Sequence, residues 1–101
     1  MFDFLKRLFG PGTDFKALKE KGALIIDVRT PGEFMAGNIS GSLNIPLDGL
    51  KAQIPVLKKK SMPVIAVCRS GNRSAMAVAQ LRQAGIEAYN GGAWISLKNK
   101  I

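Results

Sequence analysis

An apolar run that enters a short polar loop is the strongest constraint on the fold of this chain. Pro63-Val64-Ile65-Ala66-Val67 has no polar side chain and is typical of a strand buried on both faces of a parallel sheet. The loop Cys68-Arg69-Ser70-Gly71-Asn72-Arg73-Ser74 follows, and residues 74–84, closed by Gly85, have the composition of a helix. A strand, a tight loop and a helix in this order predict one unit of an α/β fold.

Further strand-like segments alternate with helix-like segments along the chain. The predicted strands cover residues 23–28, 42–45 and 86–89. The predicted helices cover residues 14–19, 31–35 and 48–57, the last interrupted by Pro55, and a short helix carrying Trp94 and Leu97 follows a turn at Gly91-Gly92. Such alternation implies a parallel sheet with helices on both faces, and ligands of these sheets bind beyond the carboxyl ends of the strands.

The chain of 101 residues is long enough for one domain with a single core. We expect residues 13–101 to form this domain and residues 1–12 to be an amphipathic or frayed N-terminal segment. No apolar run has the length of a membrane span, and charges break the first nine positions too often for a signal-peptide core. The single cysteine excludes a disulfide within the chain and suits a reducing compartment, so we expect a cytoplasmic protein.

The formal charge of +8 suggests a nucleic-acid partner, but the distribution of the charges argues against one. The basic residues are scattered except for Lys58-Lys59-Lys60, and no aromatic residue is interleaved with that run. A positive field also attracts small inorganic anions. We therefore expect a small anionic partner and no nucleic acid.

The position of Cys68 at the start of the loop suggests a nucleophilic thiolate. Backbone N–H groups of a tight loop and the N-terminus of the following helix favour negative charge at that place. Arg69 and Arg73 add positive charge, and the hydroxyls of Ser70 and Ser74 are possible donors to the sulfur. The alternative to a nucleophile is a buried structural thiol, because a free cysteine packs like a small hydrophobic residue. The chain contains no histidine, so a Cys–His hydrolase is excluded.

Four segments together resemble the single-domain rhodaneses, sulfurtransferases that carry sulfur as a cysteine persulfide. Residues 68–74 are similar to the active-site loop of that family, residues 27–34 to its first signature and residues 37–47 to the continuation of that signature. Gly91-Gly92-Ala93-Trp94 is similar to its closing motif. The resemblance implies a three-layer α/β/α sandwich with a central parallel sheet of four to five strands. It also implies an enzyme that needs no metal and no organic cofactor.

The resemblance also implies roles for individual residues. Cys68 would be the catalytic nucleophile, and the supporting residues would be Asp27 and Arg29, for which a structural hydrogen-bond network is the alternative. Asn38 stands where the family usually has histidine, so a proton-carrying role at that position would be absent here. Basic loops of this kind are associated with thiosulfate or a similar sulfane-sulfur anion. The residues that would bind this donor are Arg69, Ser70, Gly71, Asn72, Arg73 and Ser74.

Three functions stay open at this point. The chain is either a sulfurtransferase that passes sulfur from such a donor to a thiol or an acceptor protein, or a relay or partner-binding module without turnover of its own. Cysteine-based phosphatases are the third possibility. Four residues separate Cys68 from Arg73, and phosphatases that resemble this fold have one more, which makes a larger cradle for a tetrahedral oxyanion. The loop size therefore favours sulfur transfer.

Overall fold

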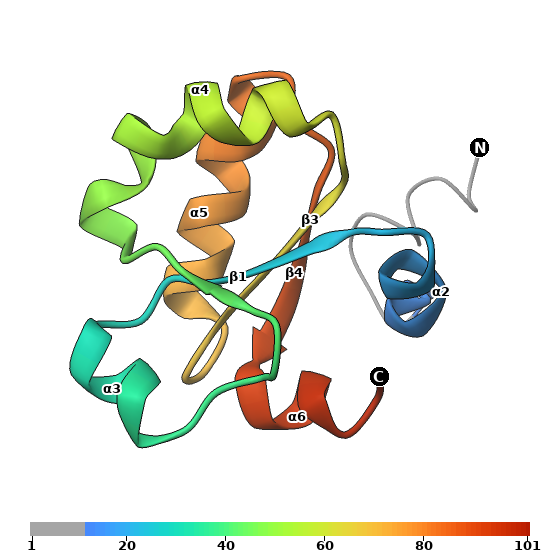
Figure 1. Cartoon of the computed structure of the whole chain (residues 1–101), viewed down its shortest axis with the longest axis vertical. Coiled ribbons are helices and arrows are strands. Elements are labelled where there is room, and N and C mark those ends of the chain that lie inside the picture. Colours follow the sequence, from blue (N-terminus) through green and yellow to red (C-terminus); the bar gives the residue numbers. More distant parts are fainter. Residues whose placement is uncertain (1–11) are drawn as a thin grey trace.

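A parallel sheet with helices on both faces forms the domain in the computed structural model, which describes residues 12–101 (Figure 1). The strand order is β2-β1-β3-β4 and all neighbouring strands are parallel. The strands are β1 (Leu24–Asp27), β2 (Leu43–Asn44), β3 (Val64–Cys68) and β4 (Ala88–Ala93). The predicted α/β architecture is confirmed, with four strands in the described part of the chain. The proposed N-terminal segment lies, apart from residue 12, outside the described residues.

The helices lie in two layers around this sheet. They are α2 (Phe15–Glu20), α3 (Pro31–Ala36), α4 (Leu50–Lys60), α5 (Asn72–Gln83) and α6 (Trp94–Lys98), with a 3₁₀ turn at Leu47–Gly49. Helices α4 and α5 cover one face, α2 and α6 lie on the other, and α3 lies near the carboxyl end of β1 (Figure 1). No helix within residues 12–101 is long and apolar enough to cross a membrane.

The alternation of side chains along β3 divides the core into two clusters. Val64, Ala66 and Cys68 pack in the cluster that includes the buried side of α5, whereas Ile65 and Val67 pack in the cluster that includes Leu97 of α6. All five residues of β3 are buried. The apolar run thus fixes β3 at the centre of the sheet and places the Cys68 side chain on the α5 face.

Helix α4 runs through Pro55 without the predicted interruption. Proline lacks the N–H that would bond to the carbonyl four residues earlier, here that of Lys51. Both Pro55 and Lys51 are exposed, so water can take the place of the missing donor. The loss of one hydrogen bond at the surface is smaller than the stability that the buried Leu50 and Leu57 provide.

Strand β4 differs from its prediction, because it begins later than residue 86 and continues through both glycines to Ala93. Ala66 pairs with Asn90 and Val67 with Gly92, so Gly91 is an extra residue, a β-bulge. A Cβ atom at Gly91 would lie 2.9 Å from the Cγ2 of Ile65 and 2.9 Å from the Cγ1 of Val67. Glycine at this position lets β4 approach β3 closely, and the predicted turn is a strand instead.

We predict that Gly91→Ala destabilises the domain by about 1–3 kcal/mol, the usual cost of forcing an extra methyl group into a packed core. Gly32→Ala is the matched control, because nothing lies within 4 Å of a Cβ atom there. Urea unfolding of both variants measures the difference. Equal stability of the two alanine variants would show that Gly91 is not needed for packing.

Candidate active site

Cys68 ends β3, and the chain turns at once into the N-terminus of α5. Gly71 precedes the helix with φ 101° and ψ −10°, in the left-handed region that favours glycine. The turn also brings Gly71 close to β4, where a Cβ atom on it would lie 3.5 Å from the Cα of Gly92. A glycine at this position therefore gives the loop its tight shape.

The sulfur of Cys68 is surrounded by hydrogen-bond donors from the loop and from α5. The Gly71 N–H donates to Sγ over 3.0 Å, and the Ser74 N–H donates over 3.4 Å. The Ser74 hydroxyl oxygen also lies 3.4 Å from Sγ. Ser74 is itself fully buried beside the sulfur. A thiol that only fills space in the core would not accept hydrogen bonds from several groups in this way.

These contacts favour the ionised form of Cys68. Burial raises the pKa of the thiol, but the Ser74 hydroxyl and the N–H groups of Ser74, Gly71 and Ser70 outweigh it, so the pKa lies below its ordinary value. All of these lowering contacts are hydrogen bonds. Hydrogen bonds from the Ser74 hydroxyl and from the loop backbone are therefore the main stabilisation of a thiolate, and the charge of Arg73 adds to them.

The sulfur is nevertheless closed off from solvent, since Cys68 has an exposed fraction of 0%. Its neighbours Arg69 and Ser70 are exposed, and so is Asn72. A reagent can reach Sγ only when the structure around it moves. The alternative prediction, a structural thiol, is thus correct in that Cys68 is buried. The hydrogen bonds to its sulfur nevertheless point to a chemical role.

Arg73 does not stand free at the loop, because it forms an ion pair with Glu33 of α3. Its Nη1 and Nη2 donate to the two carboxylate oxygens over 2.7 and 3.0 Å. The sequence analysis missed Glu33, which also accepts from the Thr30 N–H in a capping box. The Arg73 guanidinium, and then the Thr30 N–H, lower the pKa of Glu33 to about 2. Within residues 12–101, Arg69 forms no ion pair.

Asp27 and Arg29 form a buried network that braces the site and does not reach the sulfur. Arg29 donates from Nε to Oδ1 of Asp27 over 2.9 Å and from Nη2 to Oδ2 over 2.7 Å. It also donates to the carbonyl of Gly37 over 2.7 Å and lies 4.6 Å from the centre of the Trp94 ring. The pair therefore ties the end of β1 to the segment after α3 and to α6.

Asn38 likewise makes a hydrogen bond that holds neighbouring segments of the chain together. Its Nδ2 donates to the carbonyl of Phe34 over 2.9 Å, which fastens the end of α3 to the chain that follows it. No contact joins Asn38 to the sulfur loop. No group of three or more potential ligands that could hold a metal ion occurs in the described part of the chain.

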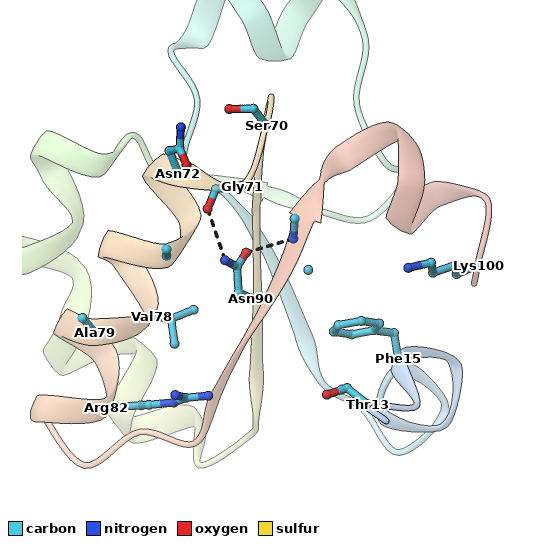
Figure 2. A pocket seen from close by; sticks show the side chains of 13 residues that line it. Thr13, Phe15, Ser70, Gly71, Asn72, Val78, Ala79, Arg82, Asn90 and Lys100 are labelled. Atoms are coloured by element: carbon cyan, nitrogen blue, oxygen red, sulfur yellow. Dashed lines mark hydrogen bonds between the residues drawn. The ribbon is translucent and has the colours of Figure 1, made fainter. Parts of the chain in front are cut away.

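Asn90 of β4 is a second residue that the sequence analysis missed. Its Nδ2 donates to the carbonyl of Gly71, and its Oδ1 accepts from the Gly92 N–H and from the Ser74 hydroxyl. Figure 2 shows its side chain on β4 beside Gly71 of the loop, on the wall of a pocket of about 750 Å³ that Ser70 and Asn72 also line. In the sequence, the one feature that pointed to Asn90 as a site residue was its polar side chain directly before Gly91-Gly92.

We predict that Ser74→Ala raises the pH midpoint of Cys68 ionisation by roughly half to one unit, the shift that corresponds to one hydrogen bond of ordinary net strength. The variant keeps the Ser74 N–H and loses only the hydroxyl. Ultraviolet absorbance of the thiolate as a function of pH measures the midpoint without access to the sulfur, and Ser70→Ala is the control because that hydroxyl makes no contact with Sγ. A midpoint that falls in Ser74→Ala would contradict the assignment.

We also predict that the Glu33–Arg73 pair makes stability depend on pH. The pKa of Glu33 is about 2 in the folded state and 4.5 as the ordinary value. Because the folded-state pKa is the lower, the stabilisation is complete above pH 4.5 and is lost as the pH falls toward 2. The stability difference between the wild type and Glu33→Gln in urea unfolding should shrink over this range. A difference that stays constant, or one equally present in Glu20→Gln, would exclude the pair as its cause.

Comparison with known proteins agrees with this geometry. The family model for the rhodanese-like domain matches residues 12–93. The chain is 39% identical over 75 residues to the thiosulfate sulfurtransferase GlpE of Pseudomonas fluorescens, covering 74% of this chain and 68% of that protein. A solved rhodanese with anions from E. coli superposes with a TM-score of 0.69 at 27% identity, covering 74% of this chain and 91% of that one.

Other relatives are much longer than this chain. It is 36% identical over 73 residues to the adenylyltransferase and sulfurtransferase MOCS3 of Drosophila virilis, which covers 66% of this chain. The chain spans 16% of that protein, and less than half of the next two curated relatives. The family match covers nearly all of the described fold and includes the Cys68 loop. The chain belongs to the rhodanese-like domain family.

Proposed function

We propose that this protein is a sulfurtransferase that carries sulfane sulfur as a persulfide on Cys68. The observation that supports this most strongly is the set of polar groups around Sγ: the N–H donors of Gly71 and Ser74, with the Ser74 hydroxyl oxygen 3.4 Å away. Donors arranged in this way stabilise negative charge on a sulfur atom both before and after it receives a second sulfur. The absence of histidine from the sequence leaves this loop as the means of activating the thiol.

The proposed reaction has two steps. The Cys68 thiolate attacks the sulfane sulfur of thiosulfate, a sulfur–sulfur bond forms to Cys68, and the bond to the sulfonate sulfur breaks so that sulfite leaves with the electron pair. A second nucleophile, such as cyanide in an assay or the thiolate of an acceptor protein, then attacks the outer sulfur and releases the Cys68 thiolate. Neither step needs an external oxidant or reductant. Because Cys68 must stay reduced between turnovers, the proposal places the protein in a reducing compartment such as the cytoplasm.

An anionic donor suits the surroundings of the loop. Arg69 is exposed beside the sulfur, and the chain carries a formal charge of +8. Thiosulfate is the donor named for the GlpE relative, and it is the donor that we propose here. Because Arg73 is neutralised by Glu33, we assign the direct charge contact to Arg69 and a weaker, indirect part to Arg73.

The size of the loop argues against phosphate-ester hydrolysis. The loop between Cys68 and Arg73 has only four residues, which leaves room for one terminal sulfur atom. Sulfur transfer fits this loop better than hydrolysis of a phosphate ester.

The burial of Sγ supports a second candidate, a relay or partner-binding module. If the exposed segment at Arg69 and Ser70 moves only when a protein partner docks, then small donors would react slowly with Cys68. Thiosulfate:cyanide turnover compared with transfer of persulfide sulfur to a protein thiol separates the two functions. Turnover with both small molecules supports the enzyme, and transfer between proteins alone supports the module.

We predict that thiosulfate adds the mass of one sulfur atom to the wild-type protein and that a reductant removes it. Cys68→Ser should show no added mass, because the chain has no second cysteine to accept sulfur. Intact-protein mass spectrometry measures the adduct, and circular dichroism checks that the variant is folded. An adduct of unchanged yield on Cys68→Ser would refute persulfide formation at this residue.

We predict that Arg69→Ala raises the KM for thiosulfate about ten- to hundred-fold, since the loss of a charge-assisted contact costs about 1.5–3 kcal/mol. Lys59→Ala is the matched control. It removes the same charge from the exposed carboxyl end of α4, which lies at the opposite end of the sheet from the loop (Figure 1). Steady-state kinetics measure both variants. Equal changes in the two would mean that only the overall charge matters and that Arg69 makes no contact.

A further inference from the structure

The hydroxyl of Ser74 lies between two groups that compete for its single hydrogen. Its oxygen is 2.7 Å from Oδ1 of Asn90, to which it donates, and 3.4 Å from Sγ of Cys68. The orientation of the Asn90 amide follows from its other contacts, because Nδ2 donates to the carbonyl of Gly71 and Oδ1 accepts from the Gly92 N–H. Asn90 is thus held with Oδ1 as the acceptor for Ser74. Figure 2 shows the hydrogen bond that joins its amide to Gly71.

We infer that Asn90 is a positioning residue that regulates ionisation of Cys68 by accepting the Ser74 hydroxyl hydrogen and turning an oxygen lone pair toward the sulfur. In this arrangement the S–H of Cys68 donates to Ser74, and Ser74 donates to Asn90, a chain that favours the thiol. The inference deepens the proposed function, on which its importance for sulfur transfer rests.

Ionisation requires this chain to reverse. The thiol proton leaves to solvent, the hydroxyl rotates, and its hydrogen turns from Oδ1 of Asn90 to the negatively charged sulfur. Oδ1 keeps the Gly92 N–H as a donor, so Asn90 is not left without a partner. Each ionisation therefore breaks the Ser74–Asn90 hydrogen bond, and Asn90 keeps more of the cysteine protonated than the loop would by itself.

The charged groups around the loop stay the same when Asn90 is changed. Where β4 faces Cys68 and Val67, it presents Ala93 and Gly92, which do not titrate. The charged groups on the other elements include Arg69 of the loop, Arg73 of α5 with Glu33 of α3, the Asp27–Arg29 pair at the end of β1, and Lys98 of α6 over the Trp94 ring. Arg82 of α5 and Lys100 line the same pocket as Asn90. A shift in the titration of Cys68 on changing Asn90 would therefore arise from hydrogen bonding.

The experiment is a cycle of four proteins, the wild type, Asn90→Ala, Ser74→Ala and the double variant, each titrated by the ultraviolet absorbance of the thiolate. We expect Asn90→Ala to lower the midpoint by roughly half to one pH unit, because the thiol loses its chain while the thiolate keeps the Ser74 hydroxyl. In the Ser74→Ala background the same change should have no effect, because no hydroxyl hydrogen is left to redirect. These results would support the inference.

A purely structural role would give the opposite result. If Asn90 only holds Gly71 and Gly92 in place, its loss loosens the donors around the sulfur, and the midpoint rises with or without Ser74. A rise, an unchanged midpoint, or a fall that persists in the double variant would overturn the inference. Asn90→Leu, which keeps the branched shape without an acceptor, repeats the test if the alanine variant does not fold, and failure of both to fold would also overturn it. The titration needs no sulfur donor, so a protein that forms no persulfide refutes the proposed function without deciding this result.

Discussion

The site depends on the hydrogen bonds that the backbone of a tight turn directs at one buried sulfur atom. The N–H groups of Gly71 and Ser74 reach Sγ only because β3 ends at Cys68 and α5 begins within four residues. Backbone donors of this kind are fixed by the fold, so they need no rearrangement when charge develops on the sulfur. The buried central strand positions the sulfur, and the positive φ of Gly71 positions the first of the donors.

Two contacts from other elements brace this turn, and a third braces the edge of the sheet beneath it. The Asp27–Arg29 network holds the end of β1 to the carbonyl of Gly37, the Glu33–Arg73 pair joins α3 to the first turn of α5, and Asn90 joins β4 to the loop. These contacts differ in strength. The first is buried and hard to replace, whereas the second is partly exposed and more readily screened by salt. The carboxyl edge of the sheet is therefore rigid beneath the sulfur and more adaptable around the mouth of the loop.

The features that depend on nearby residues could be predicted from the sequence. The run at residues 63–67, the loop that begins at Cys68 and the conformation of Gly71 all follow from local patterns, and the structure contains them. The missed features depend on residues that meet only in the fold. Glu33 lies forty residues from Arg73, and the bulge at Gly91 depends on the side chains of β3 beneath it. Sequence patterns predicted where the sulfur lies, but they did not predict which partners its neighbours would take.

The stabilisation of the Cys68 thiolate by the folded loop is tested most directly by titrating the thiol twice, once in the folded protein and once in concentrated urea. Ultraviolet absorbance reports the thiolate in both states, and the chain has only this cysteine to report. The hydrogen bonds to Sγ predict a lower midpoint in the folded protein than in urea. An equal or higher midpoint in the folded protein would show that burial outweighs the donors, and Cys68 would then be a structural thiol.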